Sequence, residues 1–261
     1  MQLYELLDKF EILFKDDERF ADLRRFFIDK DENSFFRLLA TMTDSQIVDT
    51  VRKLHNDKKF NKDCISRGQV QSKTWLIEEL QKINPKIYDL GTVFLCAGWY
   101  GTLATMLFES KIKIKRILSF DIDESCIKIA EMFNKPWYEK QWKFKALKKD
   151  IMEIDYNSLD WNFWSTKNNR MSYTITDTPD TIINTSCEHI KDFDKWYAKI
   201  PAGKLVILQS NDYFNVPEET GHVNCSKNLL EFEKQTPMSK SLYEGVLDLG
   251  EYNRFMRIGI R

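Results

Sequence analysis

Hydrophobic residues in the first part of the chain recur at three- and four-residue spacing, which is typical of amphipathic helices. Residues 1–62 follow this spacing and contain no glycine. Thr43 and Gln46 have the form of a capping box, which predicts that a helix begins there. We therefore predict an N-terminal helical annex over residues 1–62 and a second domain over residues 63–261.

The pattern changes after about residue 68, where short apolar runs alternate with stretches of helical spacing. The expected strands cover residues 92–97, 116–121, 142–147, 181–184 and 204–209. The expected helices cover residues 75–83, 102–108, 124–133 and 193–200. Such alternation predicts a mostly parallel sheet with helices on both faces.

The C-terminal end departs from this alternation. Two further strands are expected at residues 242–249 and 254–260, and the connection between them is so short that they must run antiparallel. The whole pattern predicts an α/β fold of the Rossmann-like class, with a doubly wound, mostly parallel seven-stranded sheet and a C-terminal antiparallel hairpin. Residues 155–178 and 210–240 show no regular pattern, and we expect irregular loops there.

Composition limits the classes of partner and cellular compartment. A net charge of −1 argues mildly against a dedicated binder of duplex nucleic acid. The five cysteines are odd in number and form no CxxC motif, so we expect reduced, mostly buried thiols. No signal peptide is recognisable, and no apolar run approaches the roughly 20 residues of a membrane span, so we expect a cytoplasmic protein without a membrane partner.

Two stretches of the chain are rich in basic residues. We interpret them as solvated ends of secondary-structure elements, with a local nucleic-acid patch as the alternative. They comprise Lys111, Lys113, Lys115 and Arg116 in the first stretch, and Lys140, Lys143, Lys145, Lys148 and Lys149 in the second.

Gly98 and Gly101, with Trp99 and Tyr100 between them, directly follow the first expected strand and open a helix. Glycine lets the backbone pass close beneath a nucleotide-like ligand, and a helix N-terminus favours polar or anionic groups. A tight turn without any ligand is the alternative explanation of both glycines.

Acidic residues follow the next two strands. Asp121 ends the second strand, where a carboxylate can accept hydrogen bonds from both ribose hydroxyls of an adenosine ligand. Asp123 is the expected N-cap of the next helix, which leaves Asp121 free for a ligand. Asp150 follows the third strand and can meet an adenine amino group, with an exposed loop acid as the alternative.

The order of these features over residues 68–261 resembles that of class I S-adenosylmethionine-dependent methyltransferases. The loop from Gly98 to Gly101 is similar to their motif I, although the acidic residue before the loop is missing and two bulky residues stand within it. The acids Asp121 and Asp150 and the terminal hairpin match the family's order, and the whole chain also resembles methyltransferase-like proteins of tailed bacteriophages. The resemblance implies S-adenosyl-L-methionine as the methyl donor, bound by Gly98, Trp99, Tyr100, Gly101, Asp121 and Asp150.

A dense polar run follows the fourth expected strand. In the family this position lies beside the reactive methyl group, so the resemblance implies catalytic roles for Asn184, Glu188 and His189. Glu188 or His189 could accept a proton from an amine nucleophile, and Asn184 could accept a hydrogen bond from its amino group. A helix cap surrounded by solvated residues is the alternative, and Cys187 offers no reason to be preferred as a nucleophile.

The fifth strand is also expected to end at the ligand crevice. Asn211, Tyr213 and His222 therefore become candidates for binding the acceptor, with a surface loop as the alternative. Glu188, His189 and His222 could in principle hold a metal ion, but their spacing matches no ligand pattern and we predict none. Before the first strand, Arg67 or Lys73 could pair with the carboxylate of the donor, or this segment could simply begin a helix.

We therefore predict a class I methyltransferase that transfers a methyl group in line to an acceptor, which could be a small molecule, a nucleobase or a protein side chain. One alternative is another enzyme that uses the same donor, by aminocarboxypropyl transfer or donor cleavage. A second is a non-catalytic interaction protein on the same fold. An NAD-type oxidoreductase fits less well because the three-glycine fingerprint is absent. The sequence indicates no oligomeric state.

Overall fold

The computed structural model describes residues 18–42, 45–83, 89–165, 171–214 and 221–261. The chain divides into two compact units, Met1–Lys62 and Asp63–Arg261.

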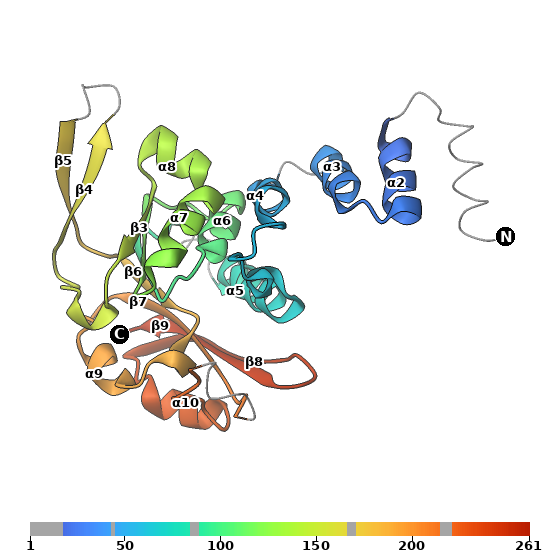
Figure 1. The fold of residues 1–261 in the computed structure, drawn as a ribbon. Coiled ribbons are helices and arrows are strands. Elements are labelled where there is room, and N and C mark those ends of the chain that lie inside the picture. The colour runs from blue at the N-terminus through green and yellow to red at the C-terminus, as the bar shows by residue number, and fades with distance from the viewer. Residues whose placement is uncertain (1–17, 43–44, 84–88, 166–170, 215–220) are drawn as a thin grey trace. The chain divides into compact units, whose positions relative to one another are not determined.

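The first unit is helical in its described part (Figure 1). Its helices are α2 (Glu18–Asp29), α3 (Glu32–Met42) and α4 (Gln46–Leu54). Ser45 is the N-cap of α4, because its side-chain oxygen accepts a hydrogen bond from the Ile47 N–H at 3.3 Å. Thr43, the predicted cap, lies outside the described residues. The observed cap, Ser45, directly precedes Gln46, the first residue of the helix.

The second unit is built on a seven-stranded sheet with the order β3-β2-β1-β6-β7-β9-β8. The strands are β1 (Thr92–Cys96), β2 (Arg116–Asp121), β3 (Phe144–Lys148), β6 (Thr181–Asn184), β7 (Leu205–Asn211), β8 (Lys240–Asp248) and β9 (Asn253–Ile260). The first five of these pair in parallel, whereas β9 runs antiparallel to both β7 and β8. The predicted Rossmann-like fold with a C-terminal antiparallel hairpin is confirmed.

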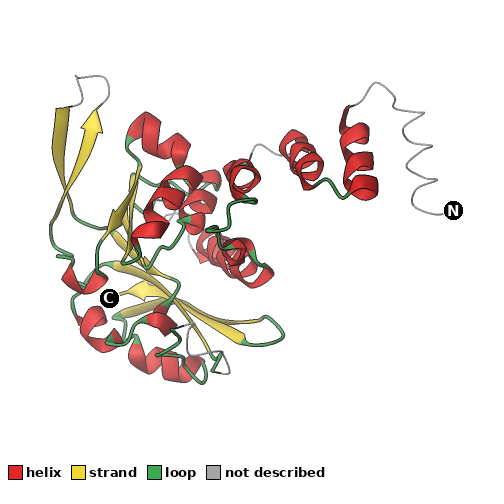
Figure 2. Ribbon diagram, in the orientation of Figure 1, coloured by secondary structure: helices red, strands yellow, loops and turns green. Residues whose placement is uncertain are grey.

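Helices cover both faces of this sheet (Figure 2). Side chains alternate along each buried strand: Val93 and Leu95 join a core with the helices α5 (Arg67–Ile83), α6 (Thr102–Glu109) and α7 (Glu124–Phe133). Phe94 and Cys96 point to the opposite core, which includes residues of α9 (Phe193–Ala198) and α10 (Leu229–Gln235). Burial on both faces explains why these strands are apolar throughout.

The expectation of an irregular loop over residues 155–178 is wrong. β4 (Leu159–Ser165) and β5 (Met171–Asp177) form a separate two-stranded antiparallel sheet. Trp161 lies opposite Ile175 and Phe163 opposite Tyr173, so cross-strand pairs of large side chains define its register. The polar residues between the strands masked this alternation in the sequence.

Two short helices were also missed. α8 (Lys135–Gln141) precedes β3, and α10 lies inside the supposedly irregular residues 210–240. Trp142 adopts a left-handed conformation with φ 50° and caps α8, so the third strand begins at Phe144, two residues after the predicted start.

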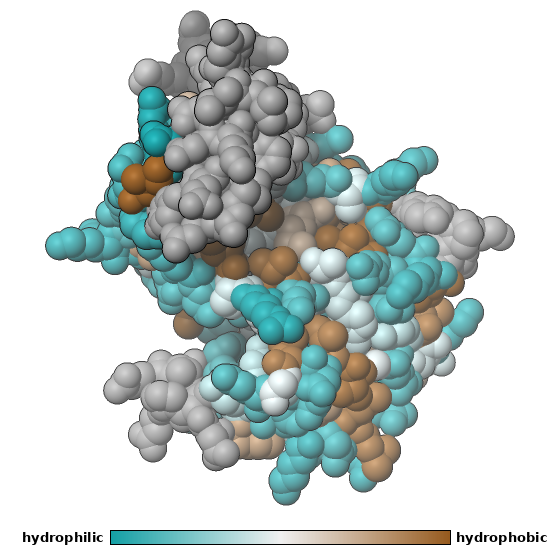
Figure 3. Space-filling model, turned by 90° about the vertical axis from the view of Figure 1, so that its right-hand side faces the viewer, coloured by the Kyte–Doolittle hydropathy of each residue, from teal (hydrophilic) through white to brown (hydrophobic). Residues whose placement is uncertain are grey.

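Figure 3 shows one face of the molecule as a mosaic of hydrophilic and hydrophobic residues. Of the helices in the described residues, none combines the length and the apolar character needed to cross a membrane.

Candidate functional site

The candidate site lies along the edge of the sheet where the parallel strands end. β1 lies between β2 and β6, and the chain reverses its direction of winding there. Ligands of open α/β sheets bind outside the carboxyl ends of the strands at such a reversal. Cys96 at the end of β1 pairs with Phe120 on one side and with Asn184 on the other, so the predicted site segments follow adjacent strands.

Asp121 connects the end of β2 to the loop that follows β1. Its Oδ2 accepts a hydrogen bond from the Trp99 N–H at 2.8 Å, and its Oδ1 accepts one from the Asp123 N–H at 3.0 Å. Asp123 caps α7 through the Ser125 N–H, as its position predicted. Asp121 is only partly buried, and each of its carboxylate oxygens retains acceptor capacity for a ligand.

The two glycines of the loop are required by packing, whatever the loop binds. A Cβ atom on Gly98 would lie 2.1 Å from the Ser119 Oγ, well inside van der Waals contact. Gly101 has φ +65°, and a Cβ there would lie 2.8 Å from the Asn134 Nδ2. The rings of Trp99 and Tyr100 stack at a centroid distance of 4.8 Å, and Tyr100 is buried. The glycine pattern alone is therefore no evidence of a ligand.

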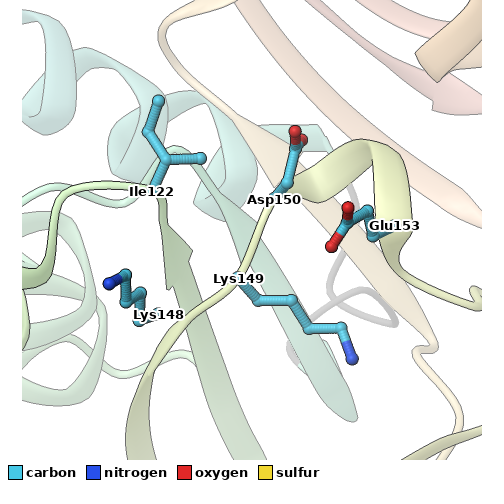
Figure 4. A pocket seen from close by; sticks show the side chains of 5 residues that line it. All are labelled: Ile122, Lys148, Lys149, Asp150 and Glu153. Atoms are coloured by element: carbon cyan, nitrogen blue, oxygen red, sulfur yellow. The ribbon is translucent and has the colours of Figure 1, made fainter.

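A hollow lies between the segment that follows β2 and the end of β3 with the segment after it (Figure 4). Ile122, Lys148, Lys149, Asp150 and Glu153 line it. Ile122 is 70% exposed, the highest value among the exposed large hydrophobic residues of the described chain. Asp150 caps a 3₁₀ helix through the Met152 N–H, to which its Oδ1 is bonded at 2.8 Å. The hollow thus offers an exposed apolar side chain and an oriented carboxylate.

A buried ion pair joins the segment after β6 to β9. Glu188 and Arg254 are 2% and 5% exposed, and the Arg254 Nη2 donates to the Glu188 Oε1 at 3.1 Å. Asn211 Nδ2 donates to the same oxygen at 2.8 Å. The second carboxylate oxygen, Oε2, is buried and has no hydrogen-bond partner among the described residues. An unpaired buried carboxylate oxygen is costly and calls for an explanation.

Asn184 is fully buried at the end of β6. Its Oδ1 accepts a hydrogen bond from the Ser186 N–H at 2.8 Å, which fixes the orientation of the amide. Its Nδ2 has no partner among the described residues. The group available for a ligand is therefore a donor, whereas the sequence suggested that Asn184 would accept a hydrogen bond.

Lys73 is buried in α5, and it donates hydrogen bonds to the side-chain and backbone oxygens of Gln69. Burial, together with the positive charge of Arg254, lowers the pKa of Lys73 to about 7. A lysine whose pKa is lowered so far toward neutral pH is unusual, and such residues concentrate at functional sites. Arg67, the other predicted partner of a donor carboxylate, is exposed.

The candidate acceptor residues of the loop after β7 have different surroundings. Asn211 is buried and fully engaged, because its Oδ1 also accepts from the Tyr213 N–H at 3.1 Å. Tyr213 stacks on Tyr252 at 4.8 Å. His222 packs edge-on against His189 with 4.7 Å between ring centroids. Burial, and then the charge of His189, lowers the pKa of His222, so its ring favours the neutral form.

Arg254 and Ile122 were missed by reasoning from the sequence. Arg254 is the second residue of β9, a strand that also contains Arg257, and both arginines are buried. Charged residues among the apolar residues of this strand were a signal of buried partners. Ile122 directly follows Asp121, and only the fold shows that it is exposed and lines the hollow.

Acidic residues accompany several members of the two basic stretches. Lys145 pairs with Glu131 at 2.6 Å and Lys148 with Glu124 at 2.7 Å. Arg116 pairs with the buried Asp177 at 2.6 Å and thereby joins β2 to β5. These ion pairs support the interpretation of the two basic stretches as solvated ends of secondary-structure elements. The cysteines are all free thiols, and four of the five are buried.

The comparisons with known proteins agree with this topology. No protein-family model matches the sequence, and no curated protein sequence matches it. The structure is similar to that of the N-methyltransferase NodS from Bradyrhizobium japonicum WM9 in complex with S-adenosyl-L-homocysteine, with a TM-score of 0.53 and 12% identity over 83% of this chain and 98% of NodS. It is also similar to magnesium protoporphyrin IX methyltransferase (ChlM) from Synechocystis PCC 6803 with bound S-adenosyl-L-homocysteine, with a TM-score of 0.54 and 13% identity over 87% of this chain and 99% of ChlM. At these identities the likeness shows the fold, which is the Rossmann-like fold of class I methyltransferases.

Proposed function

We propose that this chain is an S-adenosylmethionine-dependent methyltransferase of class I. In this proposal residues 63–261 bind the donor and the acceptor, and residues 1–62 form an annex. The observation that carries it is the position of Asp121, whose carboxylate ends β2 and is fixed by the Trp99 N–H of the loop after β1. A carboxylate fixed at this point is suited to accept hydrogen bonds from a ribose.

The hollow lined by Ile122 and Asp150 fits the rest of an adenosine group. The exposed Ile122 offers an apolar surface for a flat base, and covering it would remove apolar area from water. Asp150 offers a carboxylate oxygen for an exocyclic amino group. Gly98, Trp99, Tyr100 and Gly101 would line the donor from the loop below, and Lys73 is a candidate partner for its carboxylate.

The acceptor would bind between the ends of β6 and β7. When bound, the donor supplies a methyl group on a positively charged sulfur, already activated for displacement. The protein then has to orient the acceptor and remove its proton, for which Glu188 and His189 are the candidates, with Asn184 donating a hydrogen bond through its free Nδ2. Tyr213 and His222 would contact the acceptor, whereas Asn211 would hold Glu188 in place. A small molecule, a nucleobase or a protein side chain would suit such a polar site.

Calorimetric titration with S-adenosylmethionine and with S-adenosylhomocysteine tests the donor. The variant Asp121→Asn keeps the size of the side chain and loses its charge, and it should weaken both affinities by roughly 10- to 150-fold, because a hydrogen bond to a charged group is worth about 1.5–3 kcal/mol. The matched control is Asp123→Asn, the same substitution two residues away, since asparagine caps a helix as well as aspartate does.

Equal affinities of the Asp121→Asn variant and the unaltered protein would contradict the donor assignment. Absence of binding to either compound, in folded protein, would favour a non-catalytic interaction protein on this fold. If both compounds bind, the mass of the reaction product separates methyl transfer from aminocarboxypropyl transfer or donor cleavage. The loop after β1 departs from the family's usual pattern and holds Trp99 at φ 48°, and this departure is the reason to test for aminocarboxypropyl transfer and donor cleavage.

A further inference from the structure

Glu188 and His189, which are neighbours in the sequence, meet the distant His222 near the carboxyl ends of β6 and β7. Glu188, His189 and His222 each place one potential ligand atom within 4.8 Å of the other two. The juxtaposition follows from backbone contacts, because the N–H groups of Val223 and Asn224 donate to the Glu188 carbonyl at 2.9 and 2.8 Å. These bonds hold His222 beside the short helix that carries Glu188 and His189.

We propose that Glu188, His189 and His222 form a binding site for a divalent transition-metal ion. One carboxylate oxygen and two imidazole nitrogens are a donor set that suits zinc, manganese or iron(II). Metal binding does not require methyl transfer, but it uses Glu188 and His189, the two candidate proton acceptors named above. Where both proposals hold, these residues bind the metal ion and do not accept the proton.

The orientation of both imidazole rings supports this assignment. His189 Nδ1 lies 3.1 Å from the Gly221 carbonyl oxygen, and His222 Nδ1 lies 3.2 Å from the Tyr213 carbonyl oxygen. A carbonyl oxygen only accepts, so each bond places the ring proton on Nδ1 and leaves the lone pair on Nε2. Metal-binding histidines in proteins are commonly oriented by such a bond from the other ring nitrogen.

The buried carboxylate supplies an independent observation. Glu188 is 2% exposed, and its Oε1 is held by Arg254 and Asn211, whereas its Oε2 has no partner among the described residues. A cation on Oε2 would satisfy this unpaired carboxylate oxygen. The bonds to Oε1 would then act as the outer shell that orients a ligating carboxylate.

The distances require only a small closure. With metal–ligand bonds of about 2.0–2.2 Å, neighbouring ligand atoms of a tetrahedral ion stand about 3.3–3.6 Å apart. The ligand atoms that these residues offer lie within 4.8 Å of one another, and the exposed His189 can shift toward the ion together with the Gly221 carbonyl to which it is bonded. Three protein ligands leave at least one coordination position open, which is the arrangement of catalytic rather than structural sites.

The test uses the full chain after treatment with a chelator and dialysis. Titration with Zn²⁺, and separately with Mn²⁺, should show one ion per chain for at least one of the two metals. The single variants His189→Ala and His222→Ala should each weaken that binding at least 10-fold. His55→Ala removes the third histidine of the chain, which lies in the other unit, and should leave the affinity unchanged.

Two further measurements separate the alternatives. Cys225 lies with its Sγ 3.7 Å from the His222 Nδ1, so Cys225→Ser should retain metal binding if the site is the one proposed. Titration of each histidine variant with S-adenosylhomocysteine should give the affinity of the unaltered protein, which shows that the fold and any donor site are intact. If S-adenosylhomocysteine binds none of the proteins while the metal behaves as stated, the proposed methyltransferase function fails and the metal site stands.

Absence of binding of both Zn²⁺ and Mn²⁺ to the unaltered protein would overturn the proposal. So would equal metal affinity in the His189→Ala and His222→Ala variants that remain folded by circular dichroism. Either result would mean that the rings of His189 and His222 only pack against each other and bond to backbone carbonyls.

Discussion

Replacing Arg254 by methionine should strongly destabilise the second unit. Methionine keeps much of the length of the side chain and removes the guanidinium that faces Glu188. The side chains of both partners are almost fully buried, at 7% exposure for Arg254 and 2% for Glu188. The carboxylate would then remain in the interior with only the amide of Asn211 as a partner.

The expected loss in the free energy of unfolding is about 3–5 kcal/mol, the usual cost of leaving one partner of a buried ion pair alone. For a unit of this size that corresponds to a midpoint temperature lower by roughly 6–20 °C. All seven tryptophans lie in the second unit, so tryptophan fluorescence during urea unfolding reports on this unit alone.

Two variants make the comparison specific. Glu124→Gln breaks an exposed pair, with Lys148 and Glu124 at 58% and 77% exposure, and should cause little measurable change. The double variant Arg254→Met/Glu188→Gln removes the stranded charge and keeps an acceptor for Asn211, so it should recover part of the loss. A loss smaller than about 1 kcal/mol in the single variant, or no recovery in the double variant, would refute the reasoning.

Two further substitutions probe the same edge of the sheet. The pKa of Lys73 is lowered to about 7 from its ordinary 10.5, so the buried charge destabilises the folded state fully below pH 7 and progressively less as the pH rises toward 10.5. Lys73→Met should therefore raise the midpoint temperature of unfolding at pH 6 and raise it less at pH 9. A gain that is equal at both pH values would contradict this. Gly98→Ala should lower the free energy of unfolding by about 1–3 kcal/mol through the clash with Ser119. Adding Ser119→Ala to the same chain should restore a large part of this loss. An unchanged unfolding curve for Gly98→Ala would contradict the prediction, because it would show that the loop relaxes freely.

The pattern of the chain was sufficient to predict the central sheet. Strands such as Thr92–Cys96 are buried on both faces, so their apolar character is continuous and visible without any knowledge of their neighbours. The antiparallel hairpin formed by β8 and β9 was also predictable, because its short connection leaves no other pairing. The β4–β5 hairpin was missed, since exposed polar residues such as Asp160, Asn162 and Thr174 alternate with its large side chains and interrupt any apolar run.

The sequence alone also placed Asp121, Asn184 and Asn211 at strand ends, because parallel strands in an alternating α/β chain all end at one edge. What only the tertiary structure decided was which side chains meet and which remain exposed. Arg254 and Glu188 are 66 residues apart and become partners because β9 inserts beside β7. Burial, pKa and unpaired acceptors depend on what distant segments contribute to one place, and local periodicity carries no information about that.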